Sequence, residues 1–168
     1  VGLVQLCSGI TIRENIADTS RLIRAAAADG ATLIATPEMT HLVQKDKEDL
    51  LSKISPQEGE PAVRAFADLA KELGIDLLIG SMALKEGDKI ANRAFHFTPD
   101  GVIKARYDKI HLFDAQVSDT ESYRESSTYT AGEGPVMTAV GQTKIGLSIC
   151  YDLRFPVLYR HYAQDGAE

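Results

Sequence analysis

Three residues with complementary chemistry follow predicted β-strands: the carboxylate of Glu38, the ammonium group of Lys109 and the thiol of Cys150. Glu38 comes directly after an apolar run, Lys109 follows a second predicted strand, and Cys150 ends a third, residues 145–149. Ligands of α/β proteins bind beyond the carboxyl ends of the strands, so functional groups are expected at such positions. Each residue alone also has a common structural role, as an exposed carboxylate, a solvated lysine or an inert buried thiol. The spacing alone leaves a shared active site and three unrelated roles about equally open.

Cys150 lies where the sequence changes abruptly from strand to turn. A nucleophile at such a turn projects into a site, and the N–H of the next residue can help to bind an oxyanion. A thiol with a reference pKa of about 8.5 is mostly protonated at neutral pH, so it needs a neighbouring cation or base. Lys109 can provide the cation and Glu38 the base. Cys7, in contrast, is predicted to be a buried, inert thiol in the middle of a strand.

The first half of the chain predicts a βαβ unit. Apolar runs at 2–7 and 32–36 predict strands buried on both faces, and helical spacing between 13 and 29 predicts a helix that ends at Gly30. Two strands joined through a helix are expected to lie parallel in one sheet. The other elements predicted here are a solvated helix and loop within 41–59, a helix from Pro61 to Leu73 ended by Gly74, and a strand at 76–82.

The second half of the chain predicts antiparallel hairpins, because turn sequences separate its short apolar runs. The predicted elements are strands at 90–97, 102–107, 136–140 and 144–150, and a helix at 155–164. Residues 108–134 lack sustained periodicity, and a loop of this length inside a domain is usually functional or poorly ordered. The fold class is therefore α/β, with a mixed sheet and helices on at least one face.

Composition places the chain among globular proteins. It has 168 residues, of which 44% are hydrophobic and 25% charged, and these values exclude intrinsic disorder. A net charge of −6 excludes a generally basic nucleic-acid-binding protein, and no apolar run approaches the ~20 residues of a membrane span. Two cysteines are too few for a disulfide framework, so we expect a reduced, cytoplasmic protein. The four histidines lack the spacing of a metal site, and we expect none.

Three segments resemble the signature motifs of the nitrilase, or carbon–nitrogen hydrolase, superfamily. They are Pro37-Glu38-Met39, the run KIHLFD that begins at Lys109, and GLSICYDLRFP from Gly146 to Pro156. They occur in the order of that family, and the similarity covers essentially the whole chain. The resemblance implies a four-layer αββα sandwich of the nitrilase type with mixed sheets. Residues 1–168 would then be the N-terminal portion of a single carbon–nitrogen hydrolase domain, incomplete on its C-terminal side.

The same resemblance implies an amidase with a Glu–Lys–Cys triad that needs no metal or organic cofactor. Cys150 would be the nucleophile, and Glu38 would be the general base that takes the thiol proton and later activates water. Lys109 would stabilise the tetrahedral oxyanion together with the backbone N–H of Tyr151.

Two further residues are supporting or substrate-binding candidates. The family often carries a second glutamate in a Glu-Ser pair after the lysine segment, and Glu125-Ser126 matches that pair. Glu125 would orient Lys109 or assist proton transfer. Arg154 lies inside the third motif, where it would line the pocket or hold the cysteine turn through a salt bridge with Asp152.

The expected function is hydrolysis of a small carboxylate-bearing amide through a cysteine thioester. The motifs are similar to the branch that contains deaminated glutathione amidase and omega-amidase, while hydrolysis of N-carbamoyl amino acids or of nitriles stays open. The expected partners are the amide and water, without nucleic acid or membrane, in a homodimer or higher homo-oligomer. Two alternatives involve no hydrolysis: an inactive fragment or partner-binding module of the same fold, and a redox-sensing thiol protein that uses Cys150.

Overall fold

A computed structural model describes residues 1–168 of the chain. The helices are α1 (Ile12–Ala28), α2 (Lys47–Lys53), α3 (Pro61–Leu73) and α4 (Pro156–Gln164), with 3-10 turns η1 (Gln57–Gly59), η2 (Glu125–Ser127) and η3 (Cys150–Arg154). The strands are β1 (Gly2–Leu3), β2 (Leu33–Ala35), β3 (Asp76–Glu86), β4 (Lys89–Phe97), β5 (Ile103–Asp108), β6 (Asp114–Gln116), β7 (Ser122–Arg124), β8 (Tyr129–Thr130), β9 (Met137–Val140) and β10 (Thr143–Gly146).

The main sheet has six strands in the order β1-β2-β3-β4-β5, with β8 paired to β4. The first three strands are parallel, so that Gly2 lies opposite Ile34 and Leu33 opposite Asp76. β4 is antiparallel to both β3 and β5. The sheet is therefore mixed, and the predicted βαβ unit and the hairpins that follow it are confirmed.

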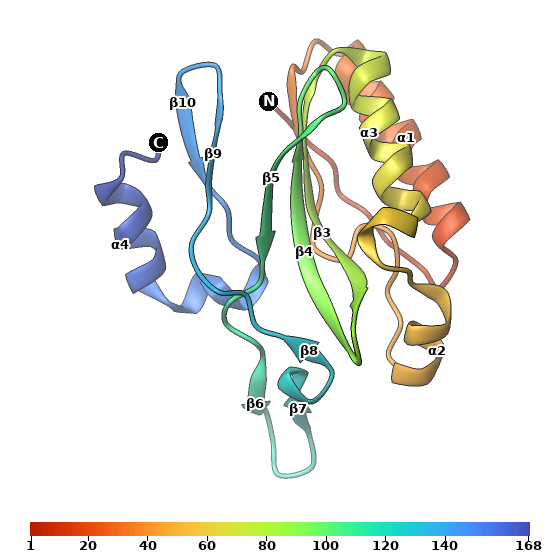
Figure 1. Cartoon of the computed structure of the whole chain (residues 1–168), viewed down its shortest axis with the longest axis vertical. Coiled ribbons are helices and arrows are strands. Elements are labelled where there is room, and N and C mark those ends of the chain that lie inside the picture. Colours follow the sequence, from red (N-terminus) through yellow and green to blue (C-terminus); the bar gives the residue numbers. More distant parts are fainter.

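Four layers are visible in Figure 1. α1 and α3 cover one face of the six-stranded sheet, the β9–β10 hairpin lies on the other face, and α4 covers the outer side of that hairpin. Lys104 on β5 donates to the Ala139 carbonyl on β9 at 2.6 Å, which ties the two sheets at one edge. The predicted αββα layering is confirmed.

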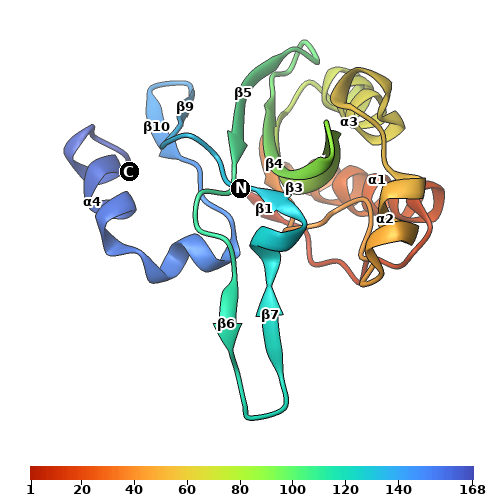
Figure 2. The same cartoon turned by 60° about the horizontal axis from the view of Figure 1, so that its bottom comes forward.

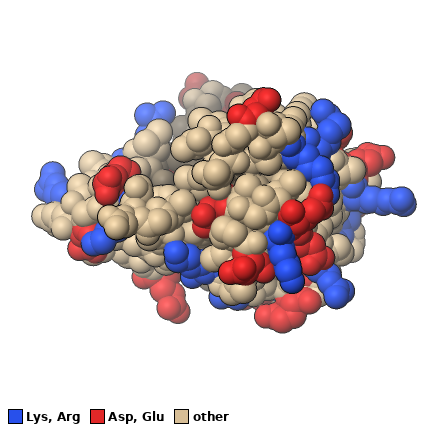
Figure 3. All heavy atoms as spheres, turned by 90° about the horizontal axis from the view of Figure 1, so that it is seen from above, with Lys and Arg blue, Asp and Glu red and all other residues tan.

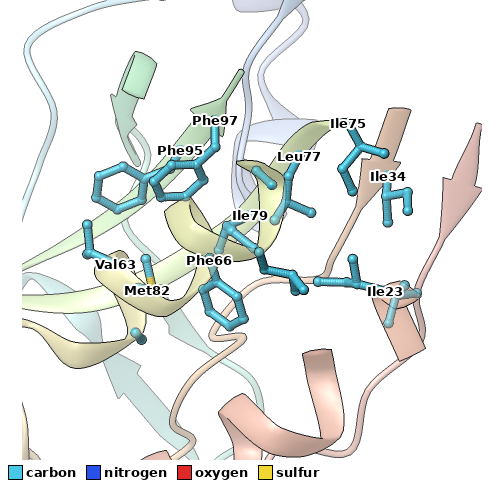
Figure 4. Packing of buried hydrophobic residues seen from close by; sticks show 14 of the residues in the cluster. Ile23, Ile34, Val63, Phe66, Ile75, Leu77, Ile79, Met82, Phe95 and Phe97 are labelled. Carbon is cyan, nitrogen blue, oxygen red and sulfur yellow. The ribbon is translucent and has the colours of Figure 1, made fainter. Parts of the chain in front are cut away.

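The main hydrophobic core lies between the six-stranded sheet and the helices α1 and α3 (Figure 4). α3 begins with Pro61, whose missing N–H suits the first turn, and ends at Gly74 in the left-handed conformation at φ 63°. Its apolar positions recur every three or four residues and face the sheet. The fully buried members of this core include Ile23, Ile34, Phe66, Leu77, Ile79, Phe95 and Phe97. Each such side chain contributes about 1.5–3 kcal/mol of burial free energy.

A smaller cluster fills the space between the two sheets. Its buried members are Ala94, Tyr107, Leu147 and Ile149. Beside it, the buried His96 ring on β4 contacts Thr138 Oγ1 at 2.6 Å through Nδ1 and Asp76 Oδ1 at 2.9 Å through Nε2. Burial lowers the pKa of His96 despite the neighbouring carboxylate. A neutral imidazole therefore links β3, β4 and β9.

Two expectations about the first strand are wrong. β1 lies at the edge of the sheet and contains only two residues. Because successive side chains of an extended chain point to opposite faces, Val4 packs into the core while Leu3 is 83% exposed. Cys7 lies beyond β1 and is exposed, so it is neither in a strand nor buried.

Residues 108–134, predicted to be a long loop, contain the β6–β7 hairpin, η2 and β8. Figure 2 shows the hairpin extending away from the body of the molecule. Its strands pair from Asp114 opposite Arg124 to Gln116 opposite Ser122. These pairs are too few to give a periodic hydrophobic pattern, which is why the sequence shows none.

The segment 41–59 was expected to be solvated, and this expectation holds only in part. α2 lies outside the sheet, and the Asp46 side chain accepts the Asp49 N–H at the start of that helix. Leu42, Leu50 and Ile54 are nevertheless buried in a second apolar cluster with Ala83 and Ile90. Because many charged residues lie between these apolar residues, the sequence does not reveal that one side of the segment is buried.

The buried histidine in this segment predicts a pH dependence of stability. Burial lowers the pKa of His41 from 6.5 to about 4. An unfolded chain protonates His41 near pH 6.5 and the folded chain does not, so stability should fall as pH drops from 6.5 to about 4. The loss is about 3 kcal/mol at most. Urea unfolding at a series of pH values should show a smaller acid slope in His41→Leu than in the wild type. The exposed His161→Leu serves as control, and equal slopes in all three proteins would contradict this expectation.

The surface carries charges of both signs. Figure 3 shows acidic and basic side chains intermixed on the face seen from above. The net charge of −6 is therefore not gathered into one acidic field on that face. No helix of the structure combines the length and the apolar character that crossing a membrane requires.

Candidate active site

Glu38 lies on the loop that follows β2, and a bulge in β3 supports this loop. At the bulge Gly80 comes so close to the loop that a Cβ atom would lie 2.2 Å from Thr36 O. The Met39 N–H donates to Ser81 Oγ at 2.9 Å, and Met39 adopts φ 53°. A side chain in this left-handed region costs about 1–3 kcal/mol and persists where its surroundings determine it. Glycine at position 80 thus allows the close packing that places Glu38.

Lys109 follows β5, and its side chain is the centre of an ionic cluster. Its backbone N–H donates to the Asn92 carbonyl on β4 at 3.0 Å. The ammonium Nζ lies 3.2 Å from Glu38 Oε1 and 3.1 Å and 3.0 Å from the two carboxylate oxygens of Glu125. Lys109 is only 3% exposed. Burial opposes its charge, but Glu38 and Glu125 outweigh burial and raise the pKa of Lys109, so it stays protonated.

Glu125 begins η2, where the chain returns from the β6–β7 hairpin. Its Oε2 also accepts the Phe113 N–H at 2.5 Å. The next residue, Ser126, donates through its N–H and its hydroxyl to the Asp114 carboxylate, at 3.0 Å and 2.5 Å. These bonds join the two ends of the hairpin and fix the carboxylate that contacts Lys109. The predicted contact between Glu125 and Lys109 is therefore present.

Cys150 does not end a strand, as the sequence suggested. β10 ends at Gly146, and Cys150 begins η3 with φ 47°. The residue is exposed, yet the protein atoms around the thiol and the nearby Glu38 charge raise the pKa of Cys150, against the opposing effect of Lys109. The thiol is therefore protonated at neutral pH. The structure brings together Glu38, Lys109 and Glu125 by direct contacts and sets Cys150 within the field of their charges.

The turn after Cys150 is held by Asp152, but not through the expected salt bridge. Asp152 is fully buried and accepts the Ile149 N–H at 2.9 Å, which closes the start of η3. Arg154 is exposed and makes no ion pair or side-chain hydrogen bond. The neighbours of the Asp152 carboxylate are instead hydroxyl, imidazole and backbone groups, which satisfy the hydrogen-bonding capacity of this buried carboxylate.

Comparison with known proteins decides the family. The family model for carbon-nitrogen hydrolase matches residues 1–168, the whole chain. The chain belongs to the carbon-nitrogen hydrolase family. It is 34% identical over 172 residues to the deaminated glutathione amidase of Yersinia enterocolitica and 34% identical over 170 residues to the chloroplastic omega-amidase of Arabidopsis thaliana.

The chain spans 59% and 46% of the lengths of these two relatives, which in turn cover 100% and 99% of it. Among solved structures, Nit3 of Saccharomyces cerevisiae, a member of branch 10 of the nitrilase superfamily, superimposes with a TM-score of 0.83 at 28% identity. That match covers 98% of this chain and 60% of the yeast chain. Fold and family therefore agree with the resemblance found in the three motifs.

The other two predicted site residues, Tyr151 and Arg154, occupy different surroundings. The Tyr151 ring packs edge-on against Phe113 and Phe155, with centroid distances of 4.9 Å and 5.4 Å. The first hydrogen bond of η3 runs from the Asp152 N–H to Ile149 O at 3.1 Å. The Tyr151 N–H belongs to the residue before this donor. Arg154 makes no contact with the ionic cluster. No group of three or more His, Cys, Asp or Glu side chains is arranged to hold a metal ion.

Sequence reasoning missed Asn92, which contacts Glu38 directly. Asn92 is fully buried on β4, and its Nδ2 donates to Glu38 Oε1 at 2.8 Å. Its Oδ1 is buried without a partner. The signal in the sequence was a polar residue within the predicted strand 90–97. The alternation of side chains along a strand places it on a face of the sheet that is covered by other residues. Buried polar groups of this kind are costly and frequently functional.

Proposed function

We propose that this chain carries the catalytic centre of an amidase that hydrolyses a small amide through a thioester on Cys150. The observation that carries the proposal is the buried ammonium of Lys109, held between the carboxylates of Glu38 and Glu125 beside the thiol. An amide carbonyl is a poor electrophile, so its hydrolysis needs a strong nucleophile and a place for negative charge on oxygen. The cluster supplies both.

Acylation begins with transfer of the thiol proton to Glu38. The sulfur then forms a bond to the carbonyl carbon while the carbonyl electron pair moves to oxygen. Lys109 and the Tyr151 N–H stabilise the resulting oxyanion. When the C=O bond re-forms, the C–N bond breaks, and the leaving nitrogen takes the proton from Glu38. Ammonia or an amine departs, and the acyl group stays on Cys150.

Deacylation repeats these steps with water. Glu38 takes a proton from a water molecule while the oxygen of that water molecule attacks the thioester carbon. Collapse of the second tetrahedral intermediate breaks the C–S bond, releases the carboxylic acid and returns the proton through Glu38 to sulfur. Glu125 holds Lys109 in place through two hydrogen bonds while Glu38 alternates between its charged and neutral forms.

The raised pKa of Cys150 supports a base-dependent mechanism over a preformed ion pair. Glu38 and Glu125 both disfavour a resting thiolate, and Lys109 offsets them only in part. A protonated thiol next to a carboxylate can react when proton transfer accompanies attack. Glu38 is therefore needed to accept the thiol proton, in addition to its ion pair with Lys109.

The substrate class rests on the relatives. Proteins named deaminated glutathione amidase and omega-amidase match nearly the whole of this chain, which supports a small carboxylate-bearing amide as substrate. N-carbamoyl amino acid and nitrile hydrolysis use the same nucleophile and are second candidates. A homodimer or higher homo-oligomer, a cytoplasmic location and the role of residues 1–168 as part of one domain stay predictions.

Release of ammonia tests the proposal. Incubation with 2-oxoglutaramate and with deaminated glutathione should give ammonia in coupled assays, and N-carbamoyl amino acids and nitriles form the comparison panel. Lys109→Met should lower kcat/KM by about 10²–10³-fold, the usual cost of one oxyanion donor. Lys104→Met is the matched control, because Lys104 is an exposed lysine whose side chain hydrogen-bonds to the Ala139 carbonyl and to no residue of the ionic cluster. Equal activity of the two lysine variants would contradict the assignment, and no turnover of any compound by the wild type would favour a non-catalytic module.

A further inference from the structure

Asp152 is the most completely engaged carboxylate in the structure. It is fully buried, and each of its oxygens accepts two hydrogen bonds. Oδ1 accepts the His111 N–H at 2.9 Å and contacts His111 Nδ1 at 2.7 Å. Oδ2 accepts the Tyr107 hydroxyl at 2.6 Å and the Ile149 N–H at 2.9 Å. Burial, together with the Asp152 carboxylate, raises the pKa of Tyr107, so its hydroxyl stays protonated and donates.

The donors to Asp152 lie close to the two central site residues in the sequence. Tyr107 and His111 flank Lys109 in the sequence by two residues each, and Ile149 directly precedes Cys150. One buried carboxylate therefore bonds to the segment that carries the ammonium and to the turn that carries the sulfur. Hydrogen bonds to an ionised acceptor are about twice as strong as those between neutral groups, so Asp152 holds the two segments firmly together.

A second contact joins the Lys109 segment to the end of η3. The His111 ring stacks on Phe155, with a centroid distance of 3.6 Å and an interplanar angle of 10°. η3 is thus held to residue 111 both through Asp152 and through Phe155. This matters because Cys150 adopts φ 47°, a conformation that costs about 1–3 kcal/mol and needs surroundings that enforce it.

We propose that Asp152 is a positioning residue that holds the Cys150 sulfur in register with the Lys109 ammonium, acting through Tyr107, His111 and Ile149. It does not touch the reacting atoms, and its role rests on the proposed amidase function. No other residue in the structure bonds to both segments through a single carboxylate.

The substitution Asp152→Asn tests this role. The asparagine amide has the same shape but only one accepting oxygen, and its NH₂ group would face hydrogen-bond donors. It therefore cannot accept all four hydrogen bonds that the Asp152 carboxylate accepts. The turn should then loosen and move Cys150 out of its register. We expect kcat to fall by about 10²-fold, the typical cost of a ~1 Å displacement of a reacting group, with a smaller change in KM.

A second readout does not depend on turnover. Shielding by protein atoms and the charge of Glu38 raise the pKa of Cys150, and both effects weaken when the sulfur moves away. The pH midpoint of iodoacetamide alkylation at Cys150 should therefore shift downward in Asp152→Asn, measured by peptide mapping with the exposed Cys7 as internal reference. A residue needed only for stability would lower the melting temperature and leave both the midpoint and the kcat of folded enzyme unchanged.

Two further variants complete the test. Tyr107→Phe removes one donor and leaves the carboxylate, so it should give a smaller shift in the same direction even if Asp152→Asn fails to fold. Asp165→Asn, at an exposed aspartate beyond α4, should match the wild type. Wild-type midpoints and kcat in both Asp152→Asn and Tyr107→Phe would overturn the proposal. If the wild type shows no turnover, the proposed function fails, and the alkylation midpoints still decide whether Asp152 positions Cys150.

Discussion

Replacing Cys150 by serine should abolish amide hydrolysis while leaving the fold intact. A serine hydroxyl is a much weaker acid than a thiol, and a carboxylate such as Glu38 is too weak a base to activate it. We expect kcat/KM to fall by at least about 10⁴-fold, as for the loss of other covalent nucleophiles. Cys150 is exposed, so the free energy of unfolding should change by only about 0.5 kcal/mol.

The measurement pairs an ammonia-release assay with detection of the acyl-enzyme. Mass spectrometry after rapid acid quench should find the acyl group on the peptide with Cys150 in the wild type and on no peptide of Cys150→Ser. Cys7→Ser is the matched control, because Cys7 is also exposed but lies beyond β1, whereas Glu38, Lys109 and Glu125 act on Cys150. Activity that survives in Cys150→Ser, or that disappears in Cys7→Ser, would contradict the nucleophile assignment.

The helices and strands of the first half of the chain were predictable from local signals, whereas the four-layer arrangement was implied only by the family resemblance. The helical spacing before Gly30, the start of α3 at Pro61 and its end at Gly74 all depend on neighbouring residues, and each lies within a residue or two of its expected place. The positions of Glu38 and Lys109 beyond strand ends follow from the same signals. That these two side chains meet depends on sheet order, which the βαβ unit and the hairpins constrain strongly.

The features that sequence reasoning missed depend on contacts between distant segments. Asn92 contacts Glu38 across 54 positions, and Asp152 contacts Tyr107 across 45. No local pattern encodes such a pair. Cys7 was misjudged for a related reason, because an apolar run indicates a strand but does not reveal that the strand ends after two residues at the edge of the sheet.

Replacing Glu38 by glutamine should change turnover and thiol reactivity in opposite directions. Loss of the general base should lower kcat by about 10²–10⁴-fold. The same change removes a negative charge that raises the pKa of Cys150, while Lys109, which lowers that pKa, remains. The thiol should then titrate at lower pH, so alkylation of Cys150 by iodoacetamide at neutral pH should become faster as hydrolysis becomes slower.

The opposed changes separate a catalytic base from a structural carboxylate. Loss of a purely structural residue would loosen the site and leave no reason for the pH midpoint of Cys150 to follow the charge at position 38. Glu38→Asp should keep the midpoint near that of the wild type, because the charge is retained, and still lose turnover because the shorter side chain withdraws the base. Glu133→Gln, at an exposed glutamate, controls for the loss of one negative charge. If Glu38→Gln left the alkylation midpoint of Cys150 unchanged, Glu38 would not act on the sulfur, and the proton transfer that begins acylation would need another acceptor.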